Sequence, residues 1–468
     1  MSGSTQTRIP RTRLLALVVL CAATLMTIVD ETVVSVALPS IQRDLGFATS
    51  DLSWVVNAYL ASFGGLLLLS GRIGDLVGRR RVLLGGLTLF VVASALCGVA
   101  GSPAWLVAAR FLQGAGGALA ASVALGMVVS LFDDPGLQAR AIGIYSFVGA
   151  AGASIGLFLG GVITDLVDWR WVFFINIPIG IATVLAGSRV LAVERGPGLR
   201  AGADAAGAVL LVAGLMLAIV AIVDADARAL GVVAAVLLVL FVRRQATARR
   251  PLLPLGILRS RIVAGANVVH ALTVAAMFGF QFLVTLYFQQ VLGYSPAQAG
   301  LAVLPVAMGI GAMSLVVFPR IERRLGARAA LLPGLLAIAA GLALLARAPV
   351  DGRYLADVAP SVALFAVGAG LVLPAVMTIA MSGATPSTAG LASGLINTSQ
   401  QVGGALGLAV LAAVAAGRTD GLRAEGVGVA ALLVFAAFGV AAIVLRPRAR
   451  RVAARGPAAT TTRAPTAR

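Results

Sequence analysis

The stretch GRIGDLVGRRRVLLGG, residues 71–86, returns in altered form as PRIERRLGARAALLPG at residues 319–334. Seven positions are identical at a shift of 248: Arg72, Ile73, Gly78, Arg80, Leu83, Leu84 and Gly86 recur as Arg320, Ile321, Gly326, Arg328, Leu331, Leu332 and Gly334. Further pairs follow at shifts of 247–254: Leu45-Gly46 with Leu292-Gly293, Gly114 and Gly116 with Gly368 and Gly370, and Gly143 and Gly156 with Gly394 and Gly407. These matches indicate an internal duplication of the chain.

The composition is that of a membrane protein. Hydrophobic residues make up 60% of the 468 positions, charged residues only 12%, and the mean hydropathy is +1.00. Soluble domains average about 45–50% apolar and 25% charged residues. Apolar blocks of about 20 residues recur, each long enough to cross roughly 30 Å of hydrocarbon. Because they are continuous runs of Leu, Val, Ala and Gly rather than alternating strands, they predict an all-α polytopic membrane protein and not a β-barrel.

The apolar pattern predicts fourteen transmembrane spans. They cover residues 14–38, 54–70, 82–100, 104–130, 141–163, 171–191, 206–223, 229–242, 262–289, 299–318, 329–346, 356–381, 389–416 and 426–445. The eighth span is short for a crossing, but without it the two chain ends would lie on opposite sides of the membrane.

The basic residues predict the orientation of these spans. All 36 are Arg, and they give a net charge of +18. Such a charge could indicate nucleic-acid binding, but the arginines lie in loops and tails, where they set topology by the positive-inside rule. With a cytoplasmic N-terminus, 28 of them lie inside, 7 outside, and Arg110 lies within a span. We therefore expect both termini in the cytoplasm and no nucleic-acid partner. The abundance of Ala, Gly and Arg without any Lys is typical of a bacterium with a GC-rich genome.

Several chemistries are not supported by the sequence. The two cysteines, Cys21 and Cys97, both lie in apolar spans, so neither a disulfide framework nor a metal site is expected. With His270 as the only histidine, zinc would have too few ligands. The chain has no G-x-x-x-x-G-K phosphate loop and no catalytic constellation. We expect no enzyme activity and no cofactor.

The duplication and the spans together define the domain organisation. Spans 1–6 and 9–14 are related halves, and spans 7 and 8 are inserted between them. The predicted segments are a cytoplasmic tail at 1–13, a six-helix bundle at 14–191, a linker with two extra helices at 192–261, a second six-helix bundle at 262–445, and a disordered basic tail at 446–468 that contacts anionic lipid. Two six-helix halves of the same orientation form a transporter architecture suited to alternating access.

Four motifs within residues 14–445 resemble the major facilitator superfamily, and within it the fourteen-span drug:proton antiporters of the multidrug efflux type. They are GRIGDLVGRRRVLL after span 2, RFLQGAGGA in span 4, DWRWVFFINIPIG entering span 6, and VDETVVSVALP in span 1. The antiporter motif of span 5 is matched by a glycine ladder: Gly149, Gly152, Gly156, Gly160 and Gly161. Leu157 stands where that motif has proline, which leaves symport open as an alternative to antiport.

Two adjacent acids, Asp30 and Glu31, lie inside the first span. An ionised carboxylate there costs at least about 2.5–3.5 kcal/mol on insertion scales, so a function is expected. The resemblance assigns the proton and cation site to Asp30, while Glu31 occupies a variable position. Adjacent helical residues point about 100° apart, so Glu31 is a titration partner, a second cation anchor or an interhelical contact.

Arg110 lies about six residues into the fourth span. It is either a snorkelling arginine near a helix end or the partner of an intramembrane carboxylate. The resemblance favours a role in proton coupling, with an acid of the first span as the partner.

Uncharged polar residues in the spans are further candidates for substrate contacts or interhelical hydrogen bonds. The candidates are Asn57, Tyr59, Gln113, Tyr145, Gln281, Asn397 and Gln400. His270 is expected to be a helix–helix hydrogen-bonding residue, with a proton relay as the alternative.

The loop after span 2 contains Gly71, Asp75, Gly78, Arg79 and Arg80. The resemblance implies a cytoplasmic gate in which Asp75 faces the N-terminal end of a helix in the second half, where an anion is favoured. The alternative is that the arginines only fix the orientation of the loop at the membrane surface and that Gly78 only forms a tight turn, with no gate.

These observations predict a proton-coupled secondary active exporter, an antiporter of hydrophobic or amphipathic cationic drugs or secondary metabolites, acting as a monomer in the plasma membrane and conferring antibiotic resistance. The alternatives are an exporter or symporter of an endogenous lipid or metabolite, and a non-transporting membrane sensor.

Overall fold

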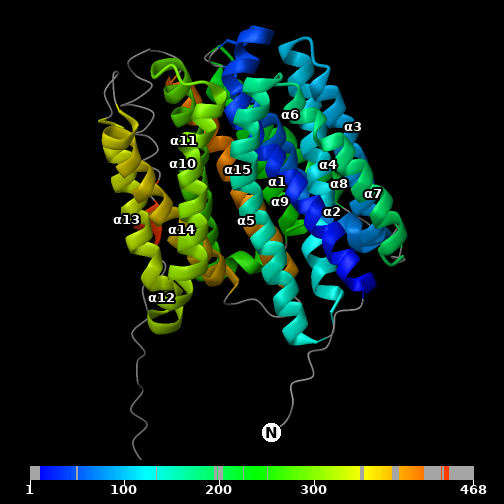
Figure 1. Cartoon of the computed structure of the whole chain (residues 1–468). Coiled ribbons are helices and arrows are strands. Elements are labelled where there is room, and N and C mark those ends of the chain that lie inside the picture. The colour runs from blue at the N-terminus through cyan, green and yellow to red at the C-terminus, as the bar shows by residue number, and fades with distance from the viewer. Residues whose placement is uncertain are drawn as a thin grey trace, which may run out of the picture.

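The computed structural model describes residues 11–48, 51–132, 134–193, 198, 204–224, 226–249, 251–253, 255–347, 353–381, 389–415, 434 and 437–441. Within these ranges every regular element is a helix, and the helices form one bundle (Figure 1). Helices from the first part of the chain, such as α3 and α7, lie on one flank in Figure 1, and α13 and α14 lie on the other.

Seven helices lie in the described part of the first half. They are α1 (Arg11–Leu45), α2 (Trp54–Val77), α3 (Arg79–Gly98), α4 (Pro103–Ser130), α5 (Pro135–Leu166), α6 (Trp171–Phe174) and α7 (Asn176–Val190). Two of them begin with a capping residue followed by proline, because such a pair satisfies a free N–H and presets the first turn. Ser102 accepts from Trp105 N ahead of α4, and Asp134 accepts from Leu137 N ahead of α5.

The remaining helices form the insert and the second half. They are α8 (Ala205–Val223), α9 (Leu230–Thr247), the 3₁₀ turn η2 (Leu255–Arg259), α10 (Arg261–Leu286), the π turn η3 (Tyr287–Val291), α11 (Pro296–Ala312), the π turn η4 (Met313–Val317), α12 (Phe318–Leu325), α13 (Ala327–Leu345), the π turn η5 (Tyr354–Val358), α14 (Ala359–Met381) and α15 (Ala389–Ala415). Eleven helices of the described part are long and apolar enough to cross a membrane. Each of the first thirteen predicted spans coincides with helix, whereas the fourteenth, 426–445, lies largely outside the described residues.

Several predicted spans are shorter than the helices that contain them: the first two, predicted to end at 38 and 70, continue to Leu45 and Val77, and the fifth, predicted from 141, begins at Pro135. The eighth, predicted at 229–242, continues to Thr247 in α9, because its last turn is polar and carries no hydropathy signal. The sixth, predicted at 171–191, is interrupted at Ile175 between α6 and α7. The tenth, predicted at 299–318, runs from Pro296 through η4 to Leu325 in α12, whose final turn is charged.

The repeated stretch folds in the same way in both halves. Gly78 ends α2 with φ of 108°, and its counterpart Gly326 ends α12 with φ of 80°, a backbone region that favours glycine. Downstream, Gly86 packs against the backbone of α4, and Gly334 packs against the backbone of α14. The duplication seen in the sequence therefore sets equivalent turns and equivalent close helix contacts.

A buried polar cluster joins the two inserted helices to the linker that follows them. Asp204 caps α8 by accepting from Gly207 N, and it also accepts from Arg244 and Gln245 at the end of α9. Gln245 in turn accepts from the backbone N–H of Leu253 at 3.1 Å. We call these residues the α8–α9 clasp.

The two halves contact each other at the end of the bundle where α1 meets α2, which we call the arginine-poor end. Gln289 donates to the Val36 carbonyl at 2.9 Å, and Ser295 donates to Asp165 at 2.9 Å. A second seam runs lengthwise between α2 and α15, where Gly64 leaves room for Gln401. The opposite, arginine-rich end holds the turns at Gly78 and Gly326; it is the lower end in Figure 1, where α12 ends.

Candidate functional site

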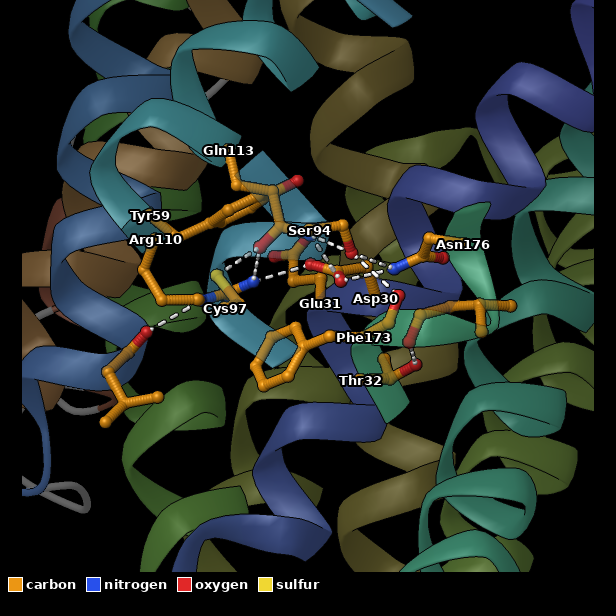
Figure 2. Close-up of polar contacts among 12 residues, drawn as sticks. Asp30, Glu31, Thr32, Tyr59, Ser94, Cys97, Arg110, Gln113, Phe173 and Asn176 are labelled. Carbon is orange, nitrogen blue, oxygen red and sulfur yellow. Dashed lines mark hydrogen bonds and ion pairs between the residues drawn. The ribbon is translucent and has the colours of Figure 1, made fainter. Parts of the chain in front are cut away.

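A buried ion pair lies at the centre of the first half. Arg110 Nη1 on α4 lies 2.6 Å from Asp30 Oδ2 on α1, and both residues have 0% of their surface exposed (Figure 2). The predicted partner of Arg110, an acid of the first span, is thus Asp30. An unpaired charge in this buried position would carry a large desolvation cost, and pairing Asp30 with Arg110 offsets that cost for both residues.

The carboxylate of Asp30 also accepts two amide donors. Gln113 Nε2 lies 2.7 Å and Asn176 Nδ2 lies 2.8 Å from Asp30 Oδ1. Both carboxylate oxygens therefore have N–H partners, contributed by α4 and α7. Bonds to a charged group are each worth about 1.5–3 kcal/mol, so Asp30 in its ionised form fastens α1 to two other helices.

The guanidinium of Arg110 is held from several sides. Its Nε donates to the carbonyl of Val55 on α2 at 2.9 Å, and its Nη1 donates to Gln113 Oε1 at 2.7 Å. Its Cζ lies 4.4 Å from the centroid of the Tyr59 ring, a cation–π arrangement. The fixed fork of arginine donors suits this set of partners, which a lysine ammonium could not match.

A further layer of bonds orients the amides. Ser94 on α3 accepts from Gln113 at 3.1 Å and from Asn176 at 3.1 Å, and its own hydroxyl donates to the carbonyl of Phe173 at 2.9 Å. Cys97 points its thiol at Gln113 Oε1 at 3.6 Å. All side chains of this network, which we call the Asp30 network, lie between residues 30 and 176.

Local sequence explains why the network forms on α4. Arg110 and Gln113 are three residues apart, so they share one face of the helix. Gly114 and Gly117 lie against Tyr59 and its neighbours on α2, and a side chain at Gly114 would collide with the Tyr59 backbone. The glycines of RFLQGAGGA therefore bring α2 close enough for its Val55 carbonyl to reach Arg110.

Glu31 faces different neighbours from Asp30. The residue is partly exposed, and its carboxyl group interacts with Gln401 on α15, in the second half of the chain. Among the described residues none forms an ion pair with Glu31. The two adjacent acids are thus divided between an interior network of the first half and the seam between the halves.

The other predicted polar candidates fall into separate places. Asn57 and Tyr59 are fully buried on α2, while Tyr145 on α5 accepts a hydrogen bond from Thr24 at 2.7 Å. Gln400 lies 3.3 Å from His270 Nε2, so the expected helix–helix contact of His270 is present. Gln281 and Asn397, like Tyr145 and Gln400, lie outside the Asp30 network: Gln281 bonds to Thr285 on its own helix, and Asn397 is exposed on α15.

The loop after α2 shows contacts within the first half. Asp75 lies 3.8 Å from Arg79, and Arg80 donates to the Ser188 carbonyl at the end of α7. The pair is solvent-exposed, and such pairs contribute about 0–1 kcal/mol. The expected contact of Asp75 with a helix of the second half is not among the interactions of the described residues, which end at Met381 and resume at Ala389 there. Gly71 lies in the last turns of α2 beside Ser122.

The glycine ladder of α5 packs mainly against α1, inside its own half. Gly149 and Gly152 face Leu25 and Ile28 of α1, and Gly156 and Gly160 lie against the α1 backbone. The fifth member, Gly161, lies against Pro296 of α11 and is the part of the ladder that meets the second half. Leu157 is buried, and its carbonyl lies where Gly300 of α11 gives it room.

Sequence reasoning missed three members of the Asp30 network. Asn176 stands in the apolar run FFINIPIG, and this isolated amide was the available signal for it. Ser94 stands in VVASALCG, where small hydroxyl residues are common in spans. The Val55 carbonyl has no sequence signal, because every residue has a carbonyl.

Comparison with known proteins identifies the family. The model of the Major Facilitator Superfamily matches residues 20–408. This chain belongs to the major facilitator superfamily. It is 38% identical over 418 residues to the puromycin resistance protein of Streptomyces alboniger, covering 87% of this chain and 83% of that one. It is 39% identical over 420 residues to the cephamycin export protein of Amycolatopsis lactamdurans, covering 88% and 86% of the two chains.

Solved structures agree with the superfamily fold. The human organic anion transporter MFSD10 has a TM-score of 0.66 at 16% identity, with 92% of this chain and 100% of that chain covered. A bacterial homologue of the lysosomal transporter Spinster, in an inward-facing unoccupied conformation, has the same TM-score at 16% identity, with 95% and 98% covered. The protein is therefore a multi-pass membrane transporter of the superfamily's drug-efflux type and not an enzyme.

Proposed function

We propose that this transporter is a proton-coupled exporter that exchanges protons for hydrophobic or amphipathic, cationic drugs or secondary metabolites. The relatives named for puromycin resistance and cephamycin export support a drug-like substrate. The distribution of arginines supports cytoplasmic termini in a bacterial plasma membrane, with the arginine-rich end facing inward.

The Asp30 network carries the proposal. It contains one buried carboxylate whose charge attracts donors from α4 and α7 and balances the buried Arg110. A proton on Asp30 removes the negative charge, so the carboxyl group loses its ionic attraction to Arg110 and can accept fewer hydrogen bonds. Protonation therefore loosens α1 from α4 and α7, and loss of the proton fastens them again.

This change is placed where it can alter the contacts between halves. α1 carries Asp30 in its middle and, two turns farther on, the Val36 carbonyl that accepts from Gln289. A shift of α1 relative to α4 thus moves one wall of the contact at the arginine-poor end. Proton and substrate movements are coupled if the arginine-poor end opens and closes only when either a proton or a substrate is bound. An empty transporter then cannot change conformation, so neither the proton nor the substrate leaks.

Transport into everted vesicles under an imposed pH gradient tests this function. The wild-type protein should accumulate puromycin when the vesicle interior is acidic, and a protonophore should abolish accumulation. Asp30→Asn should lose gradient-driven accumulation, because the network can no longer exchange a proton, while Asp224→Asn, an exposed acid at a helix end, should retain it.

The alternatives give different results in the same vesicles. Accumulation driven by the opposite gradient would indicate symport, and transport indifferent to the protonophore would refute proton coupling. Full gradient-driven transport by Asp30→Asn, at wild-type protein levels, would remove Asp30 from the mechanism.

A further inference from the structure

We propose that Glu31 forms a substrate-recognition site for protonated amines at the seam between the halves, separate from the proton site at Asp30. The inference rests on the proposed export function and names the substrate class and the residues that select it. Its members are Glu31 on α1, Tyr59 and Asn57 on α2, and Gln401 on α15.

The two acids differ in access. Asp30 has no exposed surface and is saturated by three N–H donors. Glu31, one residue on and about 100° around the helix, retains exposed surface at the same depth of the bundle. Figure 2 shows the two acids side by side, with Arg110 held on Asp30. Glu31 therefore offers a reachable carboxylate, and the cation nearest to it is already engaged.

Several polar side-chain atoms on α2 and α15, the two helices that form the seam, have no hydrogen-bond partner in the described part of the chain. Tyr59 Oη, Gln401 Oε1 and both side-chain polar atoms of Asn57 are buried without a hydrogen-bond partner among the described residues. Tyr59 and Asn57 are 0% exposed, and Gln401 is 5% exposed. Native proteins rarely leave buried polar groups unpaired, so several on one seam point to a ligand with polar groups of its own.

The positions of these residues converge on the same seam. Gln401 interacts with the Glu31 carboxyl and packs against Gly64 of α2, while Tyr59 is close enough to Glu31 to interact with its charge. Asn57 lies seven residues before Gly64, so it shares the face of α2 that meets α15, about two turns nearer the arginine-poor end.

An apolar surface adjoins the polar atoms. Phe278 of α10, which is half-buried, and Leu60 of α2 both lie within van der Waals reach of the Gly404 position, one turn beyond Gln401 on α15. A ligand can thus place a protonated amine on Glu31, hydrogen-bond to Tyr59 and Gln401, and lay an aromatic or alkyl group on Phe278. This combination selects amphipathic amines over neutral compounds of similar size.

Because Glu31 and Gln401 belong to different halves, such an amine would bridge them. The ammonium replaces the amide of Gln401 as the donor to the carboxylate, and Gln401 keeps its carbonyl oxygen free to accept from the ligand. The substrate is then bound at the seam between the two halves, whose geometry changes during alternating access.

Binding of two matched probes tests the proposal. Puromycin carries a primary amine, and N-acetylpuromycin is its neutral derivative; both are titrated against the purified full-length protein in lipid nanodiscs. Wild-type protein should bind the amine at least about 10-fold more tightly, and Glu31→Gln should remove this preference while changing the affinity for the neutral form by less than about twofold. Asp224→Asn, which changes an exposed acid at the end of α8, should keep the preference.

Asn57→Leu supplies a readout that a purely structural residue would not give. If Asn57 serves the ligand, an apolar side chain of similar size should raise the melting temperature of the ligand-free protein and weaken puromycin binding at least about 10-fold. A lower melting temperature with unchanged affinity would contradict the proposal.

Equal affinity of the wild-type protein for the two probes, absence of puromycin binding, or an intact preference in Glu31→Gln would each overturn the recognition site. Failure of the export function has a different signature, namely selective amine binding with no gradient-driven transport in vesicles.

Discussion

Arg110 has three kinds of partner besides the carboxylate of its salt bridge: a backbone carbonyl, an amide oxygen and an aromatic face. Each partner constrains a different part of the guanidinium plane. The charge alone could be supplied by another base, but the planar fork could not. The function of this residue should therefore depend on shape as well as charge.

Arg110→Lys is expected to lower gradient-driven transport at least about 10-fold while the protein still reaches the membrane, because the ammonium keeps the charge opposite Asp30 but cannot also reach Val55 and Gln113. Initial transport rates, normalised to the amount of protein in the vesicles, measure this. Transport above half of the wild-type rate would show that charge suffices.

Asn176→Leu removes one donor from a buried carboxylate without greatly changing volume. The expected loss is about 1.5–3 kcal/mol of unfolding free energy, the range for a hydrogen bond to a charged group. Detergent-solubilised protein titrated with denaturant gives this value, and Asn397→Leu, exposed on α15, is the control. Equal stability of the two variants would mean that Gln113 and Arg110 satisfy Asp30 without Asn176.

The helices show which parts of the fold can be predicted from sequence. Hydropathy indicates the spans because burial in lipid requires about 20 apolar residues. The tight turn considered at Gly78 is present, and Gly326 forms the equivalent turn in the second half. The break at Ile175 and the π turns at Tyr287–Val291 and Met313–Val317 were not predictable, because they arise from packing between helices rather than from composition.

The candidate site shows the same division. A charged residue inside a span is energetically costly and therefore rare, so the sequence alone indicates that Asp30, Glu31 and Arg110 are functional candidates. Asn176 and Ser94 could not be selected from the sequence, because other buried polar residues such as Asn267 bond to their own helix instead. Only the arrangement in space distinguishes a network member from such a residue.

Gly156→Ala is expected to destabilise the contact between α1 and α5. Its new Cβ would lie 2.9 Å from the Val29 carbonyl oxygen and closer still to Thr32, so the backbone must move. Overpacking of this kind costs about 1–3 kcal/mol, seen as a lower melting temperature. Gly85→Ala on α3 is the matched control, since no atom lies within 4 Å of its Cβ position. An unchanged melting temperature for Gly156→Ala would show that α5 is free to move away.

The acid of the α8–α9 clasp, Asp204, lies outside the predicted spans and gives a pH-dependent prediction. Burial raises the pKa of Asp204, but bonds from Arg244, the Gly207 N–H and Gln245 outweigh it and hold the pKa below its usual value. The stabilisation is therefore present above the unfolded pKa of about 3.9 and is lost as pH falls through the lower folded value.

Asp204→Ala should accordingly lower stability near neutral pH, by about 0.5–2 kcal/mol for the lost cap alone. The difference from wild type should shrink as the pH falls below about 4, where the native carboxyl also loses its charge. Thermal melts over a pH series measure it. A difference independent of pH would indicate that packing, not charge, holds the clasp.

At the scale of the whole molecule, the halves are joined at the arginine-poor end and along α2 and α15. Asp165 and Ser295 belong to different halves and are hydrogen-bonded at 2.9 Å, next to the close contact of Gly161 with Pro296. A transporter working by alternating access must separate these residues once in each cycle.

Linking the positions should therefore stop transport. In the double variant Asp165→Cys, Ser295→Cys, a short thiol-specific crosslinker is expected to abolish puromycin transport, and a cleavable version of it should restore transport on reduction. Each single variant treated in the same way is the control, and the native Cys21 and Cys97 are buried. Undiminished transport by the crosslinked protein would mean that this end does not open.

The confinement of the Asp30 network to the first 176 residues has a consequence for biosynthesis. Every partner of the Asp30 and Arg110 side chains has been synthesised before the second half leaves the ribosome, so both buried charges can be paired while the chain is still being inserted. Glu31 must wait for Gln401, which belongs to the second half of the chain. The order of synthesis thus protects the permanently buried acid first and leaves the one at the seam for final assembly.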